Sequence, residues 1–383
     1  MSRLGTESAF EVLARARALE AQGRRIIHLE IGEPDFITPA HIIEAAAEAL
    51  HQGYTHYVPA PGLPELREAL GEYFGRTGRV GYPSDRIVVT PGAKPVMFFA
   101  IMALCERGDE VLYPDPGFPM YESIASFAGA TPVPVPLREE HQFRMDPEEV
   151  ASLVTDRTRL LIINSPHNPC GSTLTRQDVE ALAHVALQRD LCVFSDEVYW
   201  ATRYEGEHAS IATVDGMADR TILLDGCSKT FAMTGWRLGF AALPPELVEP
   251  VTRLIINSVS CTAAFSQRAA LAAITGPWEP VEAMVEEFHK RRDVIVEGLN
   301  RIDGMSCLEP GGAFYVFPNV KQLGVPSQTV ASFLMDEAGV SCLSGTAFGA
   351  SGEGYLRFSY ANSVEALQEA LDAIETALPG LAP

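Results

Sequence analysis

The sequence predicts an α/β fold, with a three-layer large domain built on a mostly parallel sheet and a smaller α+β domain beside it. Between residues 87 and 243, short apolar runs alternate with helix-like segments, as in parallel strands covered by helices on both faces. After about residue 280 the pattern changes to one long helix, short strands and a closing helix. The 383 residues also exceed what one hydrophobic core usually serves.

The expected elements of the large domain follow one another in a regular order. A glycine turn and a helix-like segment (94–105) come after the first apolar run, and a Pro/Gly loop and a second such segment (120–130) come after the next run. Six runs are short enough to be buried strands: IVVT (87–90), EVLY (110–113), LLIIN (160–164), LCVFS (191–195), TILLD (221–225) and GFAAL (239–243). Because ligands of open α/β sheets bind beyond the carboxyl ends of the strands, the residues after these runs are the candidates for a site.

The two ends of the chain are expected to form the smaller domain together. The first 20 residues lack the apolar core of a secretory signal and predict an amphipathic helix. A lone helix cannot bury its apolar stripe, so we expect residues 1–44 to join residues 281–383 and leave 45–280 as the large domain. In the last part, a long helix precedes AFYVF (313–317), SCLS (341–344) and YLRFSY (355–360).

Composition and charge exclude several kinds of partner. The formal net charge is −21, and such a surface repels nucleic acid and anionic membranes. The sequence has no run of about 18 apolar residues, so no membrane-spanning helix is expected. The seven cysteines form no CxxC pair and the nine histidines show no metal-ligand spacing. This pattern favours reduced thiols in the cytoplasm over a disulfide framework or a metal site.

Candidate site residues follow the first, third and fourth apolar runs. After the first run, Gly92, Ala93 and Lys94 open a helix, where free backbone N–H groups suit a phosphate; the alternative is a plain strand–helix turn. After the third run, Asn168 could donate to a ring hydroxyl or simply belong to an Asn-Pro turn. After the fourth run, Asp196 could keep a ring nitrogen protonated or cap the next helix.

The most specific segment, GCSKTFAMTGWR (226–237), follows the fifth run. Ser228 and Arg237 could both reach a phosphate, the arginine as a planar fork. Lys229 would be a partly buried amine beside cationic groups, which lowers its pKa and makes it more nucleophilic. A lone lysine is usually a solvated surface charge. If Lys229 were one, the phosphate-binding turn, the amide, the carboxylate and the amine would follow four separate strands only by coincidence.

Seven motifs together resemble one known family, the class I/II aminotransferases of the aspartate aminotransferase superfamily. The resemblance covers nearly the whole chain and implies the fold type I architecture, pyridoxal 5′-phosphate as cofactor and a homodimer. It also implies ping-pong transfer of an amino group from an L-amino acid to a 2-oxo acid such as 2-oxoglutarate or pyruvate. The motifs are IGEPDF (31–36), YVPAPGLPELREAL (57–70), TPGAKP (90–95), NSPHNPCG (164–171), DEVY (196–199), SKTFAMTGWRLG (228–239) and YLRFSYA (355–361).

The resemblance also implies roles for the residues that carry the chemistry. Lys229 matches the lysine that holds the cofactor as a Schiff base and shuttles the proton. Asp196 matches the carboxylate paired with the ring nitrogen, and Asn168 and Tyr199 match the groups that hydrogen-bond the phenolic oxygen. Arg357 matches the arginine that binds the substrate α-carboxylate, with the Gly32 backbone and Asn168 nearby.

The same resemblance implies a set of cofactor-binding residues. Phe118 matches the aromatic residue that stacks on the ring, where Trp or Tyr is common. Tyr57 matches the tyrosine that reaches the phosphate of the neighbouring subunit. Many relatives have a serine at the position of Gly226, so Ser228 takes over its contact or the phosphate loses one donor. The phosphate itself is expected on Gly92, Ala93, Lys94, Ser228 and Arg237.

Other readings of the sequence stay open or are excluded. A lyase or synthase of the same fold shares the cofactor residues, so this alternative stays open. A non-catalytic regulator of this fold usually carries an added basic DNA-binding domain, which the strongly acidic composition does not favour. A nicotinamide dehydrogenase lacks support because no glycine fingerprint follows the first strand. The sequence does not identify the amino donor. Arg203, Arg253 and Arg268 are candidates for a cation that would bind a second substrate carboxylate.

Overall fold

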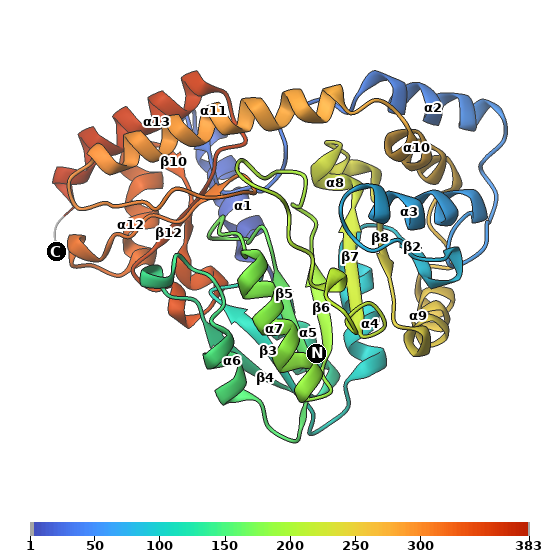
Figure 1. The fold of residues 1–383 in the computed structure, drawn as a ribbon. Coiled ribbons are helices and arrows are strands. Elements are labelled where there is room, and N and C mark those ends of the chain that lie inside the picture. Colours follow the sequence, from blue (N-terminus) through green and yellow to red (C-terminus); the bar gives the residue numbers. More distant parts are fainter. Residues whose placement is uncertain (1–3, 382–383) are drawn as a thin grey trace.

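The computed structural model describes residues 4–381, and its centre is a seven-stranded sheet with the order β2-β8-β7-β6-β5-β3-β4 (Figure 1). Strand β8 runs antiparallel to both of its neighbours, and all the other neighbouring pairs are parallel. The strands are β2 (Ile87–Thr90), β3 (Glu110–Asp115), β4 (Thr131–Pro136), β5 (Thr158–Asn164), β6 (Cys192–Asp196), β7 (Thr221–Gly226) and β8 (Gly239–Ala242). The predicted mostly parallel sheet is therefore confirmed.

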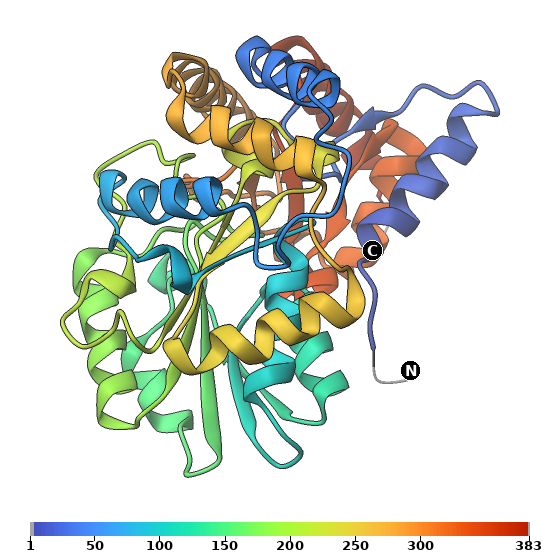
Figure 2. The same cartoon turned by 90° about the vertical axis from the view of Figure 1, so that its right-hand side faces the viewer.

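Helices cover both faces of this sheet, as Figures 1 and 2 show. Within β7, Ile222 and Leu224 point to one face and Leu223 to the other, and all three are buried. Such a continuous apolar strand is stable only between two helical layers. One layer contains α4 (Ala93–Leu104), α5 (Met120–Ala128) and α9 (Pro245–Ser258). The other contains α2 (Ala40–His51), α3 (Pro64–Arg76), α6 (Pro147–Leu153), α7 (Arg176–Gln188) and α10 (Ala264–Thr275).

The C-terminal part carries a second, smaller sheet of three antiparallel strands, in the order β11-β12-β9. These strands are β9 (Tyr315–Val316), β11 (Leu343–Ser344) and β12 (Leu356–Ser359). The helices around them are α11 (Glu279–Arg301), α12 (Ser327–Phe333) and α13 (Val364–Ala377).

The N-terminal segment lies beside this C-terminal part (Figure 1). Strand β1 (Ile27–His28) pairs in parallel with β10 (Val340–Ser341), and Ala16 of α1 (Ser8–Glu20) packs against Met335. The division into residues 1–44, 45–280 and 281–383 stays a prediction. Over residues 4–381, no helix combines the length and the apolar content needed to cross a bilayer.

Strand β4 is an element that the sequence pattern did not predict. Its sequence, TPVPVP, has proline at every second position, and proline cannot donate to a strand ladder. The strand lies at the edge of the sheet, where β3 is its only partner among the described residues, and edge strands are where proline is tolerated.

Candidate active site

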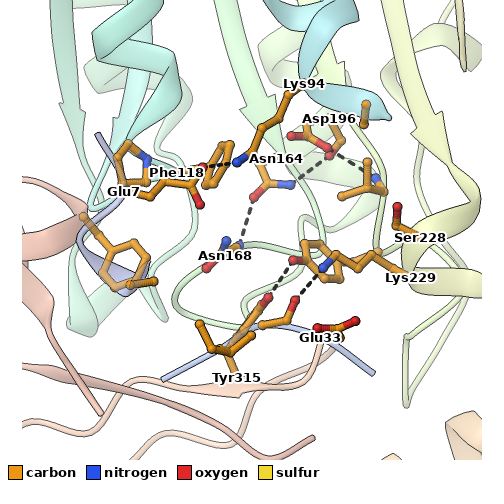
Figure 3. A pocket seen from close by; sticks show the side chains of 18 of the residues that line it. Glu7, Glu33, Lys94, Phe118, Asn164, Asn168, Asp196, Ser228, Lys229 and Tyr315 are labelled. Carbon is orange, nitrogen blue, oxygen red and sulfur yellow. Dashed lines mark hydrogen bonds and ion pairs between the residues drawn. The ribbon is translucent and has the colours of Figure 1, made fainter. Parts of the chain in front are cut away.

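A cavity of about 490 Å³ opens at the carboxyl ends of β5, β6 and β7, between the central sheet and the small antiparallel sheet (Figure 3). Segments that are far apart in the sequence line it. They include the residues before α1, the loop after β1, the start of α4 and strand β12. The topology thus brings the predicted strand-end residues to one place, as expected for an open α/β sheet.

Lys229 projects into this cavity from the short helix α8 (Cys227–Thr230), which follows β7 directly. Its Nζ donates a 2.5 Å hydrogen bond to the carbonyl of Gly32. Burial lowers the pKa of Lys229 to about 8; the carboxylate of Glu33 opposes this shift, while Arg357 and Lys94 add to it. The amine is therefore far more nucleophilic at neutral pH than an exposed lysine.

Asp196 ends β6 and is buried at the base of the cavity. Its Oδ2 accepts a 2.7 Å hydrogen bond from the hydroxyl of Tyr121, and its Oδ1 accepts one of 3.3 Å from the backbone N–H of Val198. Burial raises the pKa of Asp196 to about 6, although the Tyr121 bond favours the ionised form. A buried carboxylate of this kind is stabilised by a cation placed against it.

Two asparagines at the carboxyl end of β5 line the cavity: Asn164 is the last residue of the strand, and Asn168 lies in the loop that follows (Figure 3). The side chain of Asn164 donates to the Asp196 carbonyl at 2.9 Å and accepts from the Asn168 backbone N–H at 2.9 Å. It thereby fixes the loop that carries Asn168. The side-chain oxygen of Asn168 is buried and has no hydrogen-bond partner within residues 4–381. A buried amide oxygen without a protein partner is suited to accept a hydrogen bond from a bound ligand.

Tyr199, Tyr315 and Arg357 form a chain of contacts along one wall. The hydroxyl groups of the two tyrosines lie 2.7 Å apart and share a hydrogen bond. The guanidinium of Arg357 lies 4.7 Å from the Tyr315 ring centroid and 5.1 Å from that of Phe348. Arg357 is buried and donates from Nη2 to the carbonyl of Glu30, whereas its Nε has no partner in the described part of the chain. A guanidinium with an unused donor and no carboxylate partner in this part of the chain is suited to a substrate carboxylate.

The opposite end of the cavity has the features of an anion site. Gly92 has φ of 97°, and a Cβ there would lie 2.3 Å from Nη2 of Arg237, so glycine lets the guanidinium lie directly against the start of α4. Arg237 itself has φ of 54° and donates from Nη1 to the Thr234 carbonyl at 2.7 Å. A helix N-terminus, an arginine and the nearby Ser228 together favour a phosphate group.

The structure brings together all but two of the predicted site residues. Gly92 lies against Arg237 but does not line the cavity, and Tyr57 is 88% exposed and does not line it either. None of Arg203, Arg253 and Arg268 lines it. The predicted residues that line it are Gly32, Ala93, Lys94, Phe118, Asn168, Asp196, Tyr199, Ser228, Lys229, Arg237 and Arg357.

Several residues that line the cavity were not predicted from the sequence, among them Asn164, Tyr121, Tyr315 and Glu7. Asn164 is the last residue of an apolar run, and Tyr121 lies three residues after Phe118, so position gave a weak signal for both. Tyr315 belongs to an apolar segment without any polar pattern. Glu7 lies in the N-terminal segment, which no motif covers.

Comparison with known proteins places this geometry in a family. A sequence model of the family described as aminotransferase class I and II matches residues 24–374. The aspartate aminotransferase of Pyrococcus abyssi is 44% identical, with 92% of each chain covered. Aromatic-amino-acid aminotransferase 2 of Thermococcus litoralis is also 44% identical, covering 94% of this chain and 93% of that protein. The structure of aspartate aminotransferase from Thermus thermophilus with maleate superposes with a TM-score of 0.94 at 37% identity, covering 98% and 99% of the two chains.

The fold and these matches define the protein as a pyridoxal-phosphate-dependent enzyme of fold type I. Within that class, the chain belongs to the class I and II aminotransferase family and is an aminotransferase. The expected fold, cofactor and enzyme class are therefore confirmed. The relatives named above are all aminotransferases, which gives no support to the lyase or synthase alternative.

Proposed function

We propose that Lys229 is the amine that binds pyridoxal phosphate and moves protons during transamination, and that Arg357 binds the α-carboxylate of both substrates. The observation that carries this proposal is the position of Lys229. Its amine, with a pKa lowered to about 8, lies in one cavity with a buried carboxylate, an anion site and a buried arginine. A desolvated lysine of lowered pKa is the kind of nucleophile that forms a Schiff base with a carbonyl compound.

The residues of the cavity fit the cofactor at each of its polar groups. Arg237, Ser228 and the start of α4 would hold the phosphate, because Gly92 leaves the guanidinium in contact with that helix end. Asn168, whose buried side-chain oxygen has no partner within residues 4–381, and Tyr199 both line the cavity, where they would hydrogen-bond the ring hydroxyl. Asp196 would face the ring nitrogen, since its raised pKa calls for a positive partner.

When bound, pyridoxal phosphate supplies an aldehyde that condenses with amines and a ring that takes up electrons. Asp196 would keep the ring nitrogen protonated, and Tyr121 would hold Asp196 ionised. Lys229, as a neutral amine, would take the proton from the substrate α-carbon and donate it to the cofactor. Arg357 would orient that carbon by holding the neighbouring carboxylate in two hydrogen bonds.

We propose that the substrates are an L-amino acid donor and a 2-oxo acid acceptor, either 2-oxoglutarate or pyruvate. The relatives described above are named for aspartate and for aromatic amino acids, so they do not restrict the donor to one class. The test is a panel of amino donors assayed against both acceptors, following the conversion of the cofactor by its absorbance. Lys229→Ala is expected to lose nearly all turnover with every donor, and ordinary activity in that variant would refute the proposal.

We also propose that the active form is a homodimer in which Tyr57 contacts the phosphate of the partner subunit. The support is that Tyr57 is 88% exposed and lies outside this chain's own cavity, as a residue that serves another subunit should. Sedimentation should give twice the monomer mass, and Tyr57→Phe should weaken phosphate binding without loss of the dimer. A fully active monomer would exclude this role.

The net charge of −21 argues against nucleic acid and anionic membranes as partners, and a cytoplasmic location stays a prediction.

A further inference from the structure

A carboxylate from the N-terminal segment, Glu7, lines the cavity and forms an ion pair with Lys94 (Figure 3). The side chain of Glu7 is 18% exposed, whereas that of Lys94 is 47% exposed. The ammonium of Lys94 also lies 5.5 Å from the ring centroid of Phe118. The pair therefore joins the N-terminal segment to the wall of the site.

Contacts on both sides of Glu7 hold it at this place. Before it, the backbone N–H of Gly5 donates to the hydroxyl of Ser123 in α5 at 2.8 Å. After it, helix α1 begins at Ser8 and is attached to the C-terminal part by the Arg15–Asp336 ion pair of 2.6 Å. A carboxylate fixed in this way presents a defined charge to whatever the cavity binds.

The charge of Glu7 acts on the end of the cavity where the substrate would bind. Burial lowers the pKa of both Lys229 and Arg357, and Glu7 is among the charges that oppose this shift at each of them. Its carboxylate therefore influences both the reacting amine and the proposed α-carboxylate site, with a smaller effect than that of Glu33 on Lys229 and of Glu30 on Arg357.

Three of the four positive side chains that line the cavity have roles under the proposed function. Of the lysines and arginines that line it in the described chain, Lys229 holds the cofactor, Arg237 the phosphate and Arg357 the α-carboxylate. Lys94 is the fourth, and its charge is neutralised by Glu7. The part of the cavity left for the substrate side chain thus contains a carboxylate and, within residues 4–381, no uncompensated positive side chain.

We propose that Glu7 sets the side-chain selectivity of this aminotransferase, disfavouring substrates with a second carboxylate and favouring those whose side chain donates a hydrogen bond. This inference rests on the proposed function, because it takes Arg357 as the α-carboxylate site. A dicarboxylate must compete with Glu7 for Lys94 or lie beside a like charge, and like charges in contact are costly. A side-chain amide instead donates to the Glu7 carboxylate.

The test compares substrates of the same shape that differ only in charge. The ratio of kcat/KM for aspartate over asparagine, and for glutamate over glutamine, is measured in the loaded wild-type enzyme and in Glu7→Gln. We expect each ratio to rise about tenfold in the variant, because Lys94 is then free to meet the second carboxylate. Glu11→Gln is the matched control, since Glu11 carries the same charge on α1 but is exposed and does not line the cavity.

A binding measurement separates this inference from the catalytic proposal. Succinate and butyrate are unreactive and share one carboxylate for Arg357, so their ratio of Kd values reports only on the second carboxylate. Glu7→Gln should shift this ratio about tenfold toward succinate. Unchanged ratios in both experiments, or equal shifts in Glu11→Gln, would overturn the role of Glu7. A lack of transamination with every donor would refute the proposed function, while the Kd ratio would still decide on Glu7.

Discussion

The hydroxyl of Tyr121 donates a 2.7 Å hydrogen bond to Oδ2 of Asp196, and both side chains are buried. Tyr121 comes from α5 and Asp196 from the end of β6, so the bond joins a covering helix to the sheet. It opposes the effect of burial on the Asp196 carboxyl, which still has its pKa raised to about 6. Tyr121 therefore acts as a positioning residue that keeps this carboxylate ionised.

Tyr121→Phe removes this donor and leaves the ring in place. The pKa of Asp196 should rise further, so the acid limb of the kcat–pH profile should move to higher pH. We expect kcat at pH 7 to fall roughly tenfold to a hundredfold, the value of one hydrogen bond to a charged group. Tyr82→Phe is the control, because it removes a buried hydroxyl outside the cavity. An unshifted pH profile would assign Tyr121 a purely structural role.

The pH dependence of cofactor capture tests the state of Lys229. Only the neutral amine attacks an aldehyde, and burial lowers the pKa of Lys229 to about 8. The rate at which cofactor-free protein captures pyridoxal phosphate should therefore rise with pH and level off above about 8. Reduction with borohydride and peptide mapping identifies the site, which is simple because the chain has lysines only at 94, 229, 290 and 321.

Lys290 is the internal reference for this experiment, because Glu286 raises its pKa and keeps it protonated. Labelling should be confined to Lys229 at neutral pH. A rate that continues to rise beyond pH 10, as for an ordinary lysine, would contradict the lowered pKa.

Arg357→Ala should raise KM for amino acids strongly and change kcat less. Loss of a buried, doubly hydrogen-bonded charge partner costs on the order of 2–5 kcal/mol, so kcat/KM should fall by roughly 30-fold to several thousandfold. Arg253→Ala, which removes an exposed arginine paired with Glu249, should leave KM unchanged. If KM also stays the same in Arg357→Ala, that residue does not bind the substrate.

Gly92→Ala should weaken cofactor binding by displacing Arg237. A Cβ at Gly92 would lie 2.3 Å from Nη2 of Arg237, and the φ of 97° is also strained for alanine. Loss of a charge-assisted hydrogen bond to the phosphate should raise the Kd for pyridoxal phosphate roughly tenfold to a hundredfold, measured by absorbance titration. Gly53→Ala is the matched control, since Gly53 has φ of 83° but open space around its Cβ position. Equal Kd values in the two variants would show that Arg237 is not the affected contact.

The sequence predicted correctly those features that depend on residues close together in the chain. Gly92, Asn168, Asp196 and Lys229 each come just after a short apolar run, and the α/β pattern alone places such residues at one edge of a sheet. Strand β4 shows the limit of this reasoning. Its alternating prolines look incompatible with a strand, and only its position at the sheet edge makes them acceptable.

The α/β pattern was thus sufficient to predict the fold class, whereas the cofactor and the roles of the site residues followed from the resemblance of the motifs to a known family. Tertiary packing alone produced the pairs that adjust that chemistry. Tyr121 and Asp196 are 75 residues apart, Glu7 and Lys94 are 87 apart, and Tyr199 and Tyr315 are 116 apart. No period or motif in the chain relates the members of these pairs, because strand order and helix packing bring them together. Burial then makes their hydrogen bonds and ion pairs stronger than they would be between exposed side chains.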